Sequence, residues 1–416
     1  MSTQTAMAEW NPMKPEELAD PYVSYARARR EEPVFYSPIL DAWLVTRYDD
    51  LLAVLKDPRF SSRDSIYIGG VPEEVADKLP HGYPWDHPSL INLDPPAHTR
   101  IRKLANQAFK PTEIAAKEQM VREIAAALID GFAAAGEVEL MERFAVPFPG
   151  QVMCRLLDVP AESAADVIRW TDDFLVMLDP QLPHERRIEA SLGSADFYAF
   201  CESFIDGRTA DPGDDIMSAL ILARDREVEG EPALTKPELI SIFSQLLIGG
   251  VETTRRMIGN LVLRLLQHPA QIEEVRGDHG LAPAAVEEGL RHSSPTKGLF
   301  RRATEDVELG GATIPAGALV VVLWASGSHD ETKFEDPEAF DIHRANAKDN
   351  LAFSRYAHFC IGAPLARLEL RVALETLLER LPGLRLADEG PPQWAPLPLH
   401  HGLVRLDVAW DAEAAS

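Results

Sequence analysis

The sequence predicts a mainly α-helical fold with small β-sheets near both ends (α+β), forming a single domain over residues 1–416. Three observations support this prediction. Helical periodicity of the apolar residues continues from Pro96 to His268. Short β-type runs bounded by glycine and proline lie before and after this region. No linker rich in proline, glycine or serine separates the parts, so we expect no second domain.

The N-terminal part is mixed. Two short strands, Pro33–Tyr36 and Ala42–Val45, are predicted before a short helix at Tyr48–Leu55 that Asp57-Pro58 ends. Residues 61–93 contain many glycines and prolines, but they are too apolar for a disordered segment. We interpret this long loop as a lid or binding loop. Its large apolar residues are Ile66, Tyr67, Ile68, Tyr83 and Trp85.

The longest predicted helix begins at Thr235, where Thr235 and Glu238 form a capping box with Pro237 in the first turn. Apolar residues recur from Leu239 to Leu266 on nearly all sides of this helix. A helix that is apolar all round is normally buried. We therefore expect it to run through the middle of the protein.

The C-terminal third changes to short strands followed by one helix. Glycine and proline turns join three predicted strands at residues 307–309, 313–314 and 318–323. A helix from Ala363 to Leu381 follows and ends at Pro382-Gly383. Residues Leu399–Val408 are predicted to form a hairpin that turns near His401-Gly402.

Composition excludes several classes of protein. With 41 Lys and Arg against 66 Asp and Glu, the net charge is −25, which disfavours nucleic-acid binding through the overall field. Three cysteines are too few for a disulfide framework and indicate a reducing compartment. No signal peptide or membrane-spanning run is recognisable. We expect a cytoplasmic monomer without a membrane partner.

Cys360 is the first candidate for chemistry because it lies just before the helix that starts at Ala363. The N-terminus of a helix lowers the pKa of a thiol toward the thiolate. Cys154 and Cys201 lie inside helical patterns and are interpreted as small buried apolar residues.

The string Phe353 to Glu369, FSRYAHFCIGAPLARLE, resembles the heme-ligand loop of the cytochrome P-450 family. The family pattern has Phe seven residues before the Cys, His two before, Gly two after and Leu-Ala-Arg in the next turn. The resemblance implies the P-450 fold, with heme b as cofactor, Cys360 as its thiolate iron ligand and the long helix over the heme. Ser354 and Tyr356 replace two family glycines. Since glycine adopts positive φ at little cost, we expect the loop to follow a locally different path.

The second motif, Gly249–Thr254, lies in the middle of the long helix. Two glycines there cost about 1 kcal/mol each relative to alanine, and taken alone they fit a close helix crossing beside a polar face. The family resemblance implies a helix distortion at the place where O2 binds. It also implies that Glu252 and Thr253 handle protons there, and a back-bonded threonine would give the distortion a local cause.

Glu288 and Arg291 form a third motif. Alone, an acid–base pair three residues apart is an ordinary surface pair. The resemblance implies a buried structural triad with Arg344, which holds the chain that leads to Cys360.

His98 and Arg102 form a fourth motif, which by itself fits a solvated basic helix face. The resemblance implies that they hold a carboxylate of the heme together with Arg301 and His358. Buried carboxylates require cationic or polar donors of this kind.

The resemblance covers about the whole chain and implies a monooxygenase that uses O2 and two electrons to hydroxylate or otherwise oxidise a small hydrophobic or aromatic organic molecule. No glycine-rich dinucleotide fingerprint follows a strand, so we expect no fused reductase. The electrons are then expected from a separate ferredoxin-type donor and its reductase. The basic residues expected on the docking face are Arg100, Lys103, Arg355 and Arg367.

Three alternatives remain open. A peroxide-driven peroxygenase is disfavoured because that branch of the family replaces the Glu252-Thr253 pair. A heme-based gas or redox sensor without turnover would need neither this pair nor the loop at 61–93. A substrate tethered to a carrier protein is compatible with the sequence.

The family layout implies a mostly apolar substrate pocket, which suits a hydrophobic molecule. Lys297, His400 and His401 are possible polar handles for a carboxylate on that molecule. The predicted lining residues are Leu246, Leu247, Gly250, Lys297, Leu299 and His400.

Overall fold

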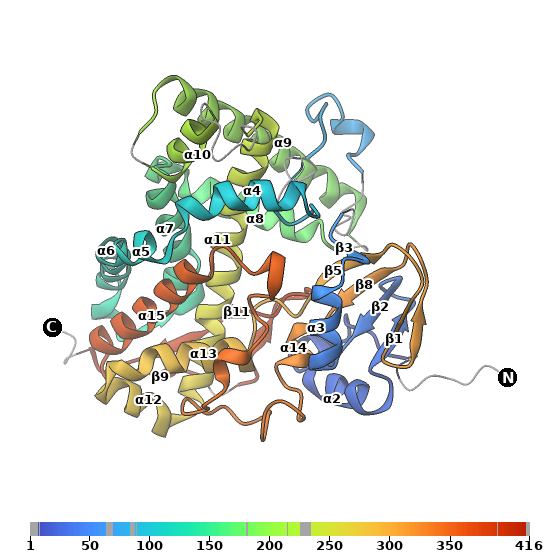
Figure 1. Cartoon of the computed structure of the whole chain (residues 1–416). Helices are drawn as coiled ribbons and strands as arrows, with labels where there is room; N and C mark the ends of the chain where they lie inside the picture. The colour runs from blue at the N-terminus through green and yellow to red at the C-terminus, as the bar shows by residue number, and fades with distance from the viewer. Residues whose placement is uncertain are drawn as a thin grey trace.

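The computed structural model describes residues 7, 9–63, 70–83, 88, 90–179, 182–213, 215–224, 234–388 and 390–412. Helices make up most of the molecule, and the largest sheet lies at one side, as Figure 1 shows. Within the predicted lid loop, Ile66, Tyr67, Ile68 and Trp85 lie outside the described residues. Tyr83 is described: its ring is buried, and its hydroxyl is hydrogen-bonded to the hydroxyl of Ser191 at 2.8 Å.

The predicted helices are present, and more are found between them. The α-helices of the described residues are α1 (Pro15–Ala19), α2 (Tyr22–Glu31), α3 (Tyr48–Lys56), α4 (Ala97–Ala108), α5 (Pro111–Ala115), α6 (Glu118–Asp130), α7 (Pro147–Leu157), α8 (Ala164–Val176), α9 (His184–Ala210), α10 (Ile216–Arg224), α11 (Lys236–Leu266), α12 (Pro269–Gly277), α13 (Ala282–His292), α14 (Trp324–Gly327) and α15 (Ala363–Arg380).

The strands form one larger sheet and three small ones. The larger sheet has the order β1-β2-β8-β5-β3, in which β2 and β8 are parallel and the other neighbours antiparallel. The small sheets are β4-β12-β9, β6-β7 and β10-β11. The strands are β1 (Val34–Ser37), β2 (Ala42–Val45), β3 (Phe60–Ser61), β4 (Glu137–Glu139), β5 (Leu299–Ala303), β6 (Val307–Leu309), β7 (Ala312–Ile314), β8 (Leu319–Val322), β9 (Arg385–Leu386), β10 (Gln393–Trp394), β11 (Leu403–Arg405) and β12 (Asp407–Ala409).

Helix α11 runs through the middle of the molecule, as the sequence predicted (Figure 1). It begins with the predicted capping box, in which Thr235 and Glu238 bond to each other's backbone N–H groups. It packs against α7, α8, α9, α13 and α15, and most of its residues are buried. Gly250 lies at the crossing with α7, since a Cβ atom there would stand 2.5 Å from the sulfur of Met153.

The predicted hairpin at Leu399–Val408 is wrong in its pairing. Strand β11 pairs with β10, upstream of Leu399, and β12 pairs with β4 and β9. Pro396 and Pro398 lack the N–H groups that a ladder needs, so the chain between β10 and β11 forms a longer connection. His400 instead makes an isolated antiparallel bridge with Thr296.

Candidate active site

Cys360 lies immediately before α15, as predicted. The backbone N–H groups of Gly362 and Ala363 point at its sulfur and act to lower the pKa of the thiol, as do the charges of Arg102 and Arg367. Burial outweighs all of them and raises the pKa of Cys360 above its ordinary value. The helix terminus thus acts in the predicted direction, but it does not by itself bring the pKa of this thiol below its ordinary value.

The loop before Cys360 keeps a left-handed backbone at both positions where the family has glycine. Ser354 has φ of 59° and Tyr356 has φ of 58°. The N–H of Cys360 donates to the carbonyl of Phe353 at 2.9 Å, which closes the loop. The expected different path is thus wrong. The two non-glycine residues accept the strain because the surrounding hydrogen bonds and the start of α15 hold the chain in place.

Four basic side chains meet beside this loop: His98 and Arg102 from α4, Arg301 from β5, and His358. The rings of His98 and His358 lie 4.2 Å apart. Nε2 of His98 is buried without a hydrogen-bond partner. Among the described residues, no carboxylate forms an ion pair with Arg102 or Arg301; the Arg301 guanidinium donates to the carbonyl of Phe300 at 2.8 Å. The structure therefore brings the predicted set together around an unmatched positive charge.

The electrostatics of this cluster follow from its burial. Burial lowers the pKa of Arg301 to about 10 and also lowers that of Arg102. Burial, with the nearby charges of Arg301 and His98, lowers the pKa of His358 to about 3, and burial lowers that of His98. At neutral pH the cluster offers two guanidinium charges and two neutral imidazoles. This donor set fits a ligand that carries two carboxylates.

Asp94 binds two serines that lie beside this cluster. Its carboxylate accepts hydrogen bonds from the N–H of Ser62, at 2.8 Å, and from the hydroxyl of Ser61. The hydroxyl of Ser62 lies 3.0 Å from Nε2 of His358. Asp94 is therefore occupied in fixing β3 and the residues after it, and sequence reasoning did not assign it this role.

In the middle of α11, the hydroxyl of Thr253 donates to the carbonyl of Gly249 at 2.8 Å. Helix α11 is continuous from Lys236 to Leu266, so the chain does not leave the helix at this bond, and the distortion expected here stays a prediction. Gly249 has nothing within 4 Å of the place a Cβ would take, whereas Gly250 packs on α7. Leu247 is fully buried in the core. The assignment of Leu247 to the pocket is therefore wrong, whereas Gly250 is partly exposed and its assignment to the pocket stays a prediction.

The residues of α11 that face the open space are spaced as one helical face. Leu246, Gly249 and Thr253 lie three or four residues apart, and Gly249 and Thr253 are more exposed than their neighbours. Gly249 was not predicted as a pocket residue, although its spacing of four from Thr253 could have been read from the sequence.

Glu252 is buried and forms ion pairs with Arg255 and Arg256, one turn further along α11. Arg255 also pairs with Asp172 of α8, whose side chain is half exposed. The stem of Arg256 lies against Gly402, where a Cβ would stand 2.5 Å from it. The acid next to Thr253 is thus held by two cations that reach to α8 and to the turn before β11. Neither Arg255 nor Arg256 was predicted to belong to the site from the sequence.

Lys297 and His400 do not form a cationic handle. Lys297 is 1% exposed, and burial lowers its pKa to about 8, while the opposite charge that acts on it is Glu17 of α1. The ammonium therefore lies in the core and interacts with α1, near the N-terminus of the chain. Burial lowers the pKa of His400 to about 3, so it is neutral at pH 7. His401 is buried and stacks on Trp394 at 3.9 Å, and Leu299 packs in the core beside the larger sheet.

The predicted triad is assembled and buried. Arg291 and Glu288 are wholly buried and paired at 2.7 Å, and Arg344 donates to the same carboxylate at 3.2 Å. Arg291 also donates to three backbone carbonyls, of Ser328, Pro337 and Ala339. These carbonyls lie on the irregular chain that leads to the Cys360 loop, so the triad fixes that chain in place.

Comparison with known proteins supports the assignment of the fold and site to one family. The family model for cytochrome P-450 matches residues 200–391. The chain is 39% identical over 399 residues to the cytochrome P-450 monooxygenase PikC of Streptomyces venezuelae, covering 94% of this chain and 91% of that protein. It is 37% identical to 6-deoxyerythronolide B hydroxylase of Saccharopolyspora erythraea, covering 94% of this chain and 96% of that protein.

A solved structure of a cytochrome P-450 has the same fold as this chain. The structure of cytochrome P-450 CYP109Q5 from Chondromyces apiculatus has a TM-score of 0.85 and 36% identity, covering 99% of this chain and 100% of that chain. The fold and these relatives thus define a heme-dependent oxidoreductase. The chain belongs to the cytochrome P-450 family, whose members named above are oxidoreductases with monooxygenase or hydroxylase activity. Among the described residues, every helix is too short or too polar to span a bilayer.

Proposed function

We propose that this chain is a monooxygenase that holds heme b through Cys360 and receives its two electrons from a separate ferredoxin-type protein and that protein's reductase. The observation that carries the proposal is that Cys360, just before α15, lies beside four basic side chains. These are His98, Arg102, Arg301 and His358. When bound, the heme supplies a thiolate-ligated iron at which O2 is reduced. Its two carboxylates match the two guanidiniums of Arg102 and Arg301, and His98 and His358 offer neutral donors.

On the opposite side of the site, Thr253 and Glu252 are proposed to handle protons. The hydroxyl of Thr253 donates its proton to the carbonyl of Gly249, one helical turn earlier. The space beside Gly249 is open, since no atom lies within 4 Å of the place that a Cβ would take. Glu252 lies next to it and connects through Arg255 to Asp172, whose side chain is 48% exposed. This chain of charged groups links the acid to solvent. A positioned proton donor typically contributes about 10²–10⁴-fold to a rate.

The substrate is proposed to be a hydrophobic organic molecule. Leu246 and Gly249 of α11 offer apolar surface beside Thr253. No cation of the described residues at Lys297 or His400 supports a carboxylate handle, because one faces Glu17 and the other is neutral. By its name, the relative from Saccharopolyspora erythraea hydroxylates 6-deoxyerythronolide B.

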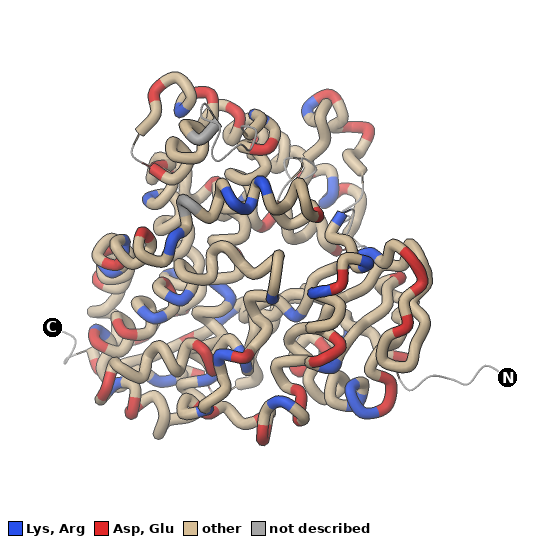
Figure 2. Tube along the Cα trace, viewed as in Figure 1, with Lys and Arg blue, Asp and Glu red and all other residues tan. Residues whose placement is uncertain are grey.

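The face that carries the Cys360 loop is proposed to be the side on which the electron donor docks. Figure 2 shows Lys and Arg along α4 on this side, mixed with acidic segments elsewhere. The predicted basic set is smaller than expected, because Arg100 pairs with Glu238 and Arg367 with Glu287. Lys103 also interacts with another group, so it is not a free cation on this face. Arg355 remains a candidate for the docking face, because its guanidinium bonds to two backbone carbonyls and pairs with no carboxylate of the described residues.

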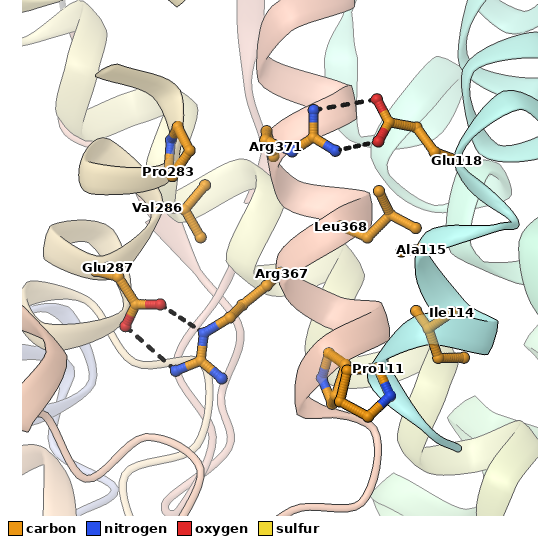
Figure 3. A pocket seen from close by; sticks show the side chains of 11 residues that line it. Pro111, Ile114, Ala115, Glu118, Pro283, Val286, Glu287, Arg367, Leu368 and Arg371 are labelled. Carbon is orange, nitrogen blue, oxygen red and sulfur yellow. Dashed lines mark hydrogen bonds and ion pairs between the residues drawn. The ribbon is translucent and has the colours of Figure 1, made fainter. Parts of the chain in front are cut away.

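Next to this face lies a cavity of about 240 Å³ between α5, α13 and α15 (Figure 3). Its walls are mainly apolar. At its rim the Arg371 guanidinium meets Glu118 at 2.6 Å, and Arg367 meets Glu287. Since both arginines are neutralised, this cavity adds apolar surface but no free charge to the docking side.

The test is the ferrous–CO spectrum of the purified protein. We expect the red-shifted Soret band of thiolate-ligated heme, and we expect Cys360→Ala to lose it. Cys154→Ala and Cys201→Ala are matched controls, because both thiols are buried in the core and burial raises their pKa. Retention of the band in Cys360→Ala would remove the proposed ligand.

A further inference from the structure

The exposed positions of α11 follow one line along the helix. Within Glu238–Leu263 every residue is buried except Gln245, Gly249, Gly250 and Thr253. Gln245, Gly249 and Thr253 follow one another at intervals of four residues, so they lie on a single face of the helix. Because several helices pack against α11 in the middle of the molecule (Figure 1), this face borders a space inside the protein rather than its outer surface.

Gln245 differs from its neighbours on this face because it carries an amide. Ile242 and Leu246, one turn before it and directly after it, are apolar and buried. Among the described residues, the amide nitrogen of Gln245 makes one long hydrogen bond, to the hydroxyl of Ser241 at 3.4 Å, and the amide oxygen accepts none. An amide without good partners beside apolar side chains is unfavourable. This group is therefore suited to bind a polar atom of a ligand.

The amide lies at a defined distance from the proposed proton donor. Gln245 precedes Thr253 by two helical turns, which corresponds to about 12 Å along the helix axis. Between them Gly249 has nothing within 4 Å of the place that a Cβ would take, so this stretch of the face is open. Two turns before Gln245, Arg100 of α4 pairs with Glu238 and covers the start of the helix. An extended molecule therefore has room along this face, with one end at Thr253 and the other at Gln245.

We propose that Gln245 selects the substrate by a hydrogen bond to a neutral hydroxyl or carbonyl group that lies about 12 Å from the carbon to be oxidised. The inference rests on the proposed function and adds the class of substrate, which is an extended hydrophobic molecule with one neutral oxygen at its far end. An amide fits this oxygen because it offers both a donor and an acceptor and carries no charge. The ion pair of Arg100 with Glu238 leaves no free charge at this end for an ionised group.

The test uses the heme-loaded protein with n-decanol and n-decyl chloride as probes, since only the alcohol has an end group that forms strong hydrogen bonds. Dissociation constants are measured from the shift of the heme absorption to the high-spin form on binding. Gln245→Met keeps the length of the side chain and removes the amide. We expect it to weaken the binding of n-decanol about three- to tenfold, as for one neutral hydrogen bond, and to leave the binding of n-decyl chloride within about twofold.

Gln267→Met is the matched control, because it makes the same change at the exposed C-terminal end of α11, where Gln267 bonds to Arg264. It should leave the binding of both probes unchanged. The parent should oxidise n-decanol near the end opposite its hydroxyl, and Gln245→Met should spread oxidation along the chain.

Three results would overturn the inference: Gln245→Met weakens both probes equally, it weakens neither, or n-decanol leaves the spectrum of the parent unchanged. If the parent instead lacks the red-shifted ferrous–CO band, the proposed function itself fails, which is a separate result.

Discussion

Replacing Arg291 by methionine tests whether the buried triad holds the chain that leads to Cys360. The guanidinium of Arg291 is wholly buried, bonds to both oxygens of Glu288 and donates to three backbone carbonyls. Methionine keeps much of the volume, but among the described residues it leaves the buried carboxylate with only the Arg344 guanidinium and the N–H of Asp341. Removing one partner of a buried ion pair typically costs about 3–5 kcal/mol.

This loss is large beside the total free energy of unfolding of a protein, which is about 5–15 kcal/mol. We expect Arg291→Met to lower the stability measured by urea unfolding by about 3–5 kcal/mol. We also expect a smaller fraction of the purified protein to contain heme, because the unpaired carbonyls lie on the segment before the ligand loop. The assays are the urea midpoint and the ratio of heme to protein.

Arg27→Met is the matched control, because Arg27 pairs with Glu31 on α2 with side chains that are 55% and 49% exposed. An exposed pair of this kind contributes about 0.2–1 kcal/mol. If Arg291→Met and Arg27→Met lose similar amounts of stability, below about 1 kcal/mol, the triad does not organise this segment and the reasoning is refuted.

Two further outcomes follow from the site and the core. Thr253→Ala should keep heme binding but lower the product formed per reductant and raise hydrogen peroxide; reductant, product and peroxide counted in one assay decide it, and full coupling would exclude the role of Thr253. His292 is buried, and burial together with the charge of nearby His329 lowers its pKa well below the ordinary value. The unfolded chain binds a proton there that the fold excludes, so the contribution of His292 to stability should fall as the pH drops through about 6.5, by about 1.4 kcal/mol between pH 7.5 and 5.5. Urea midpoints measured across that range should show a smaller decline in His292→Asn, and an unchanged decline would contradict the assignment.

Local features of the sequence determined much of the fold. The capping box at Thr235 and the apolar run after it predicted α11 with its first residue. Glycine and proline turns predicted β6, β7 and β8. These predictions succeed because caps and turns depend on interactions within a few residues, which the sequence states directly. The spacing around Cys360 also indicated the family, and the basic side chains inferred from it meet in the structure.

Tertiary contacts decided the rest. Lys297 follows Thr296 in sequence, but the fold buries its ammonium toward Glu17 of α1, 280 positions earlier. Glu252 is held by Arg255 and Arg256, and only the packing of α8 on α11 adds Asp172 to this group. The pKa of Cys360 is raised because burial outweighs the helix terminus, and burial is a property of the whole fold. Likewise, Ser354 and Tyr356 adopt a strained backbone because distant segments fix the loop, and no local preference of serine or tyrosine would choose it.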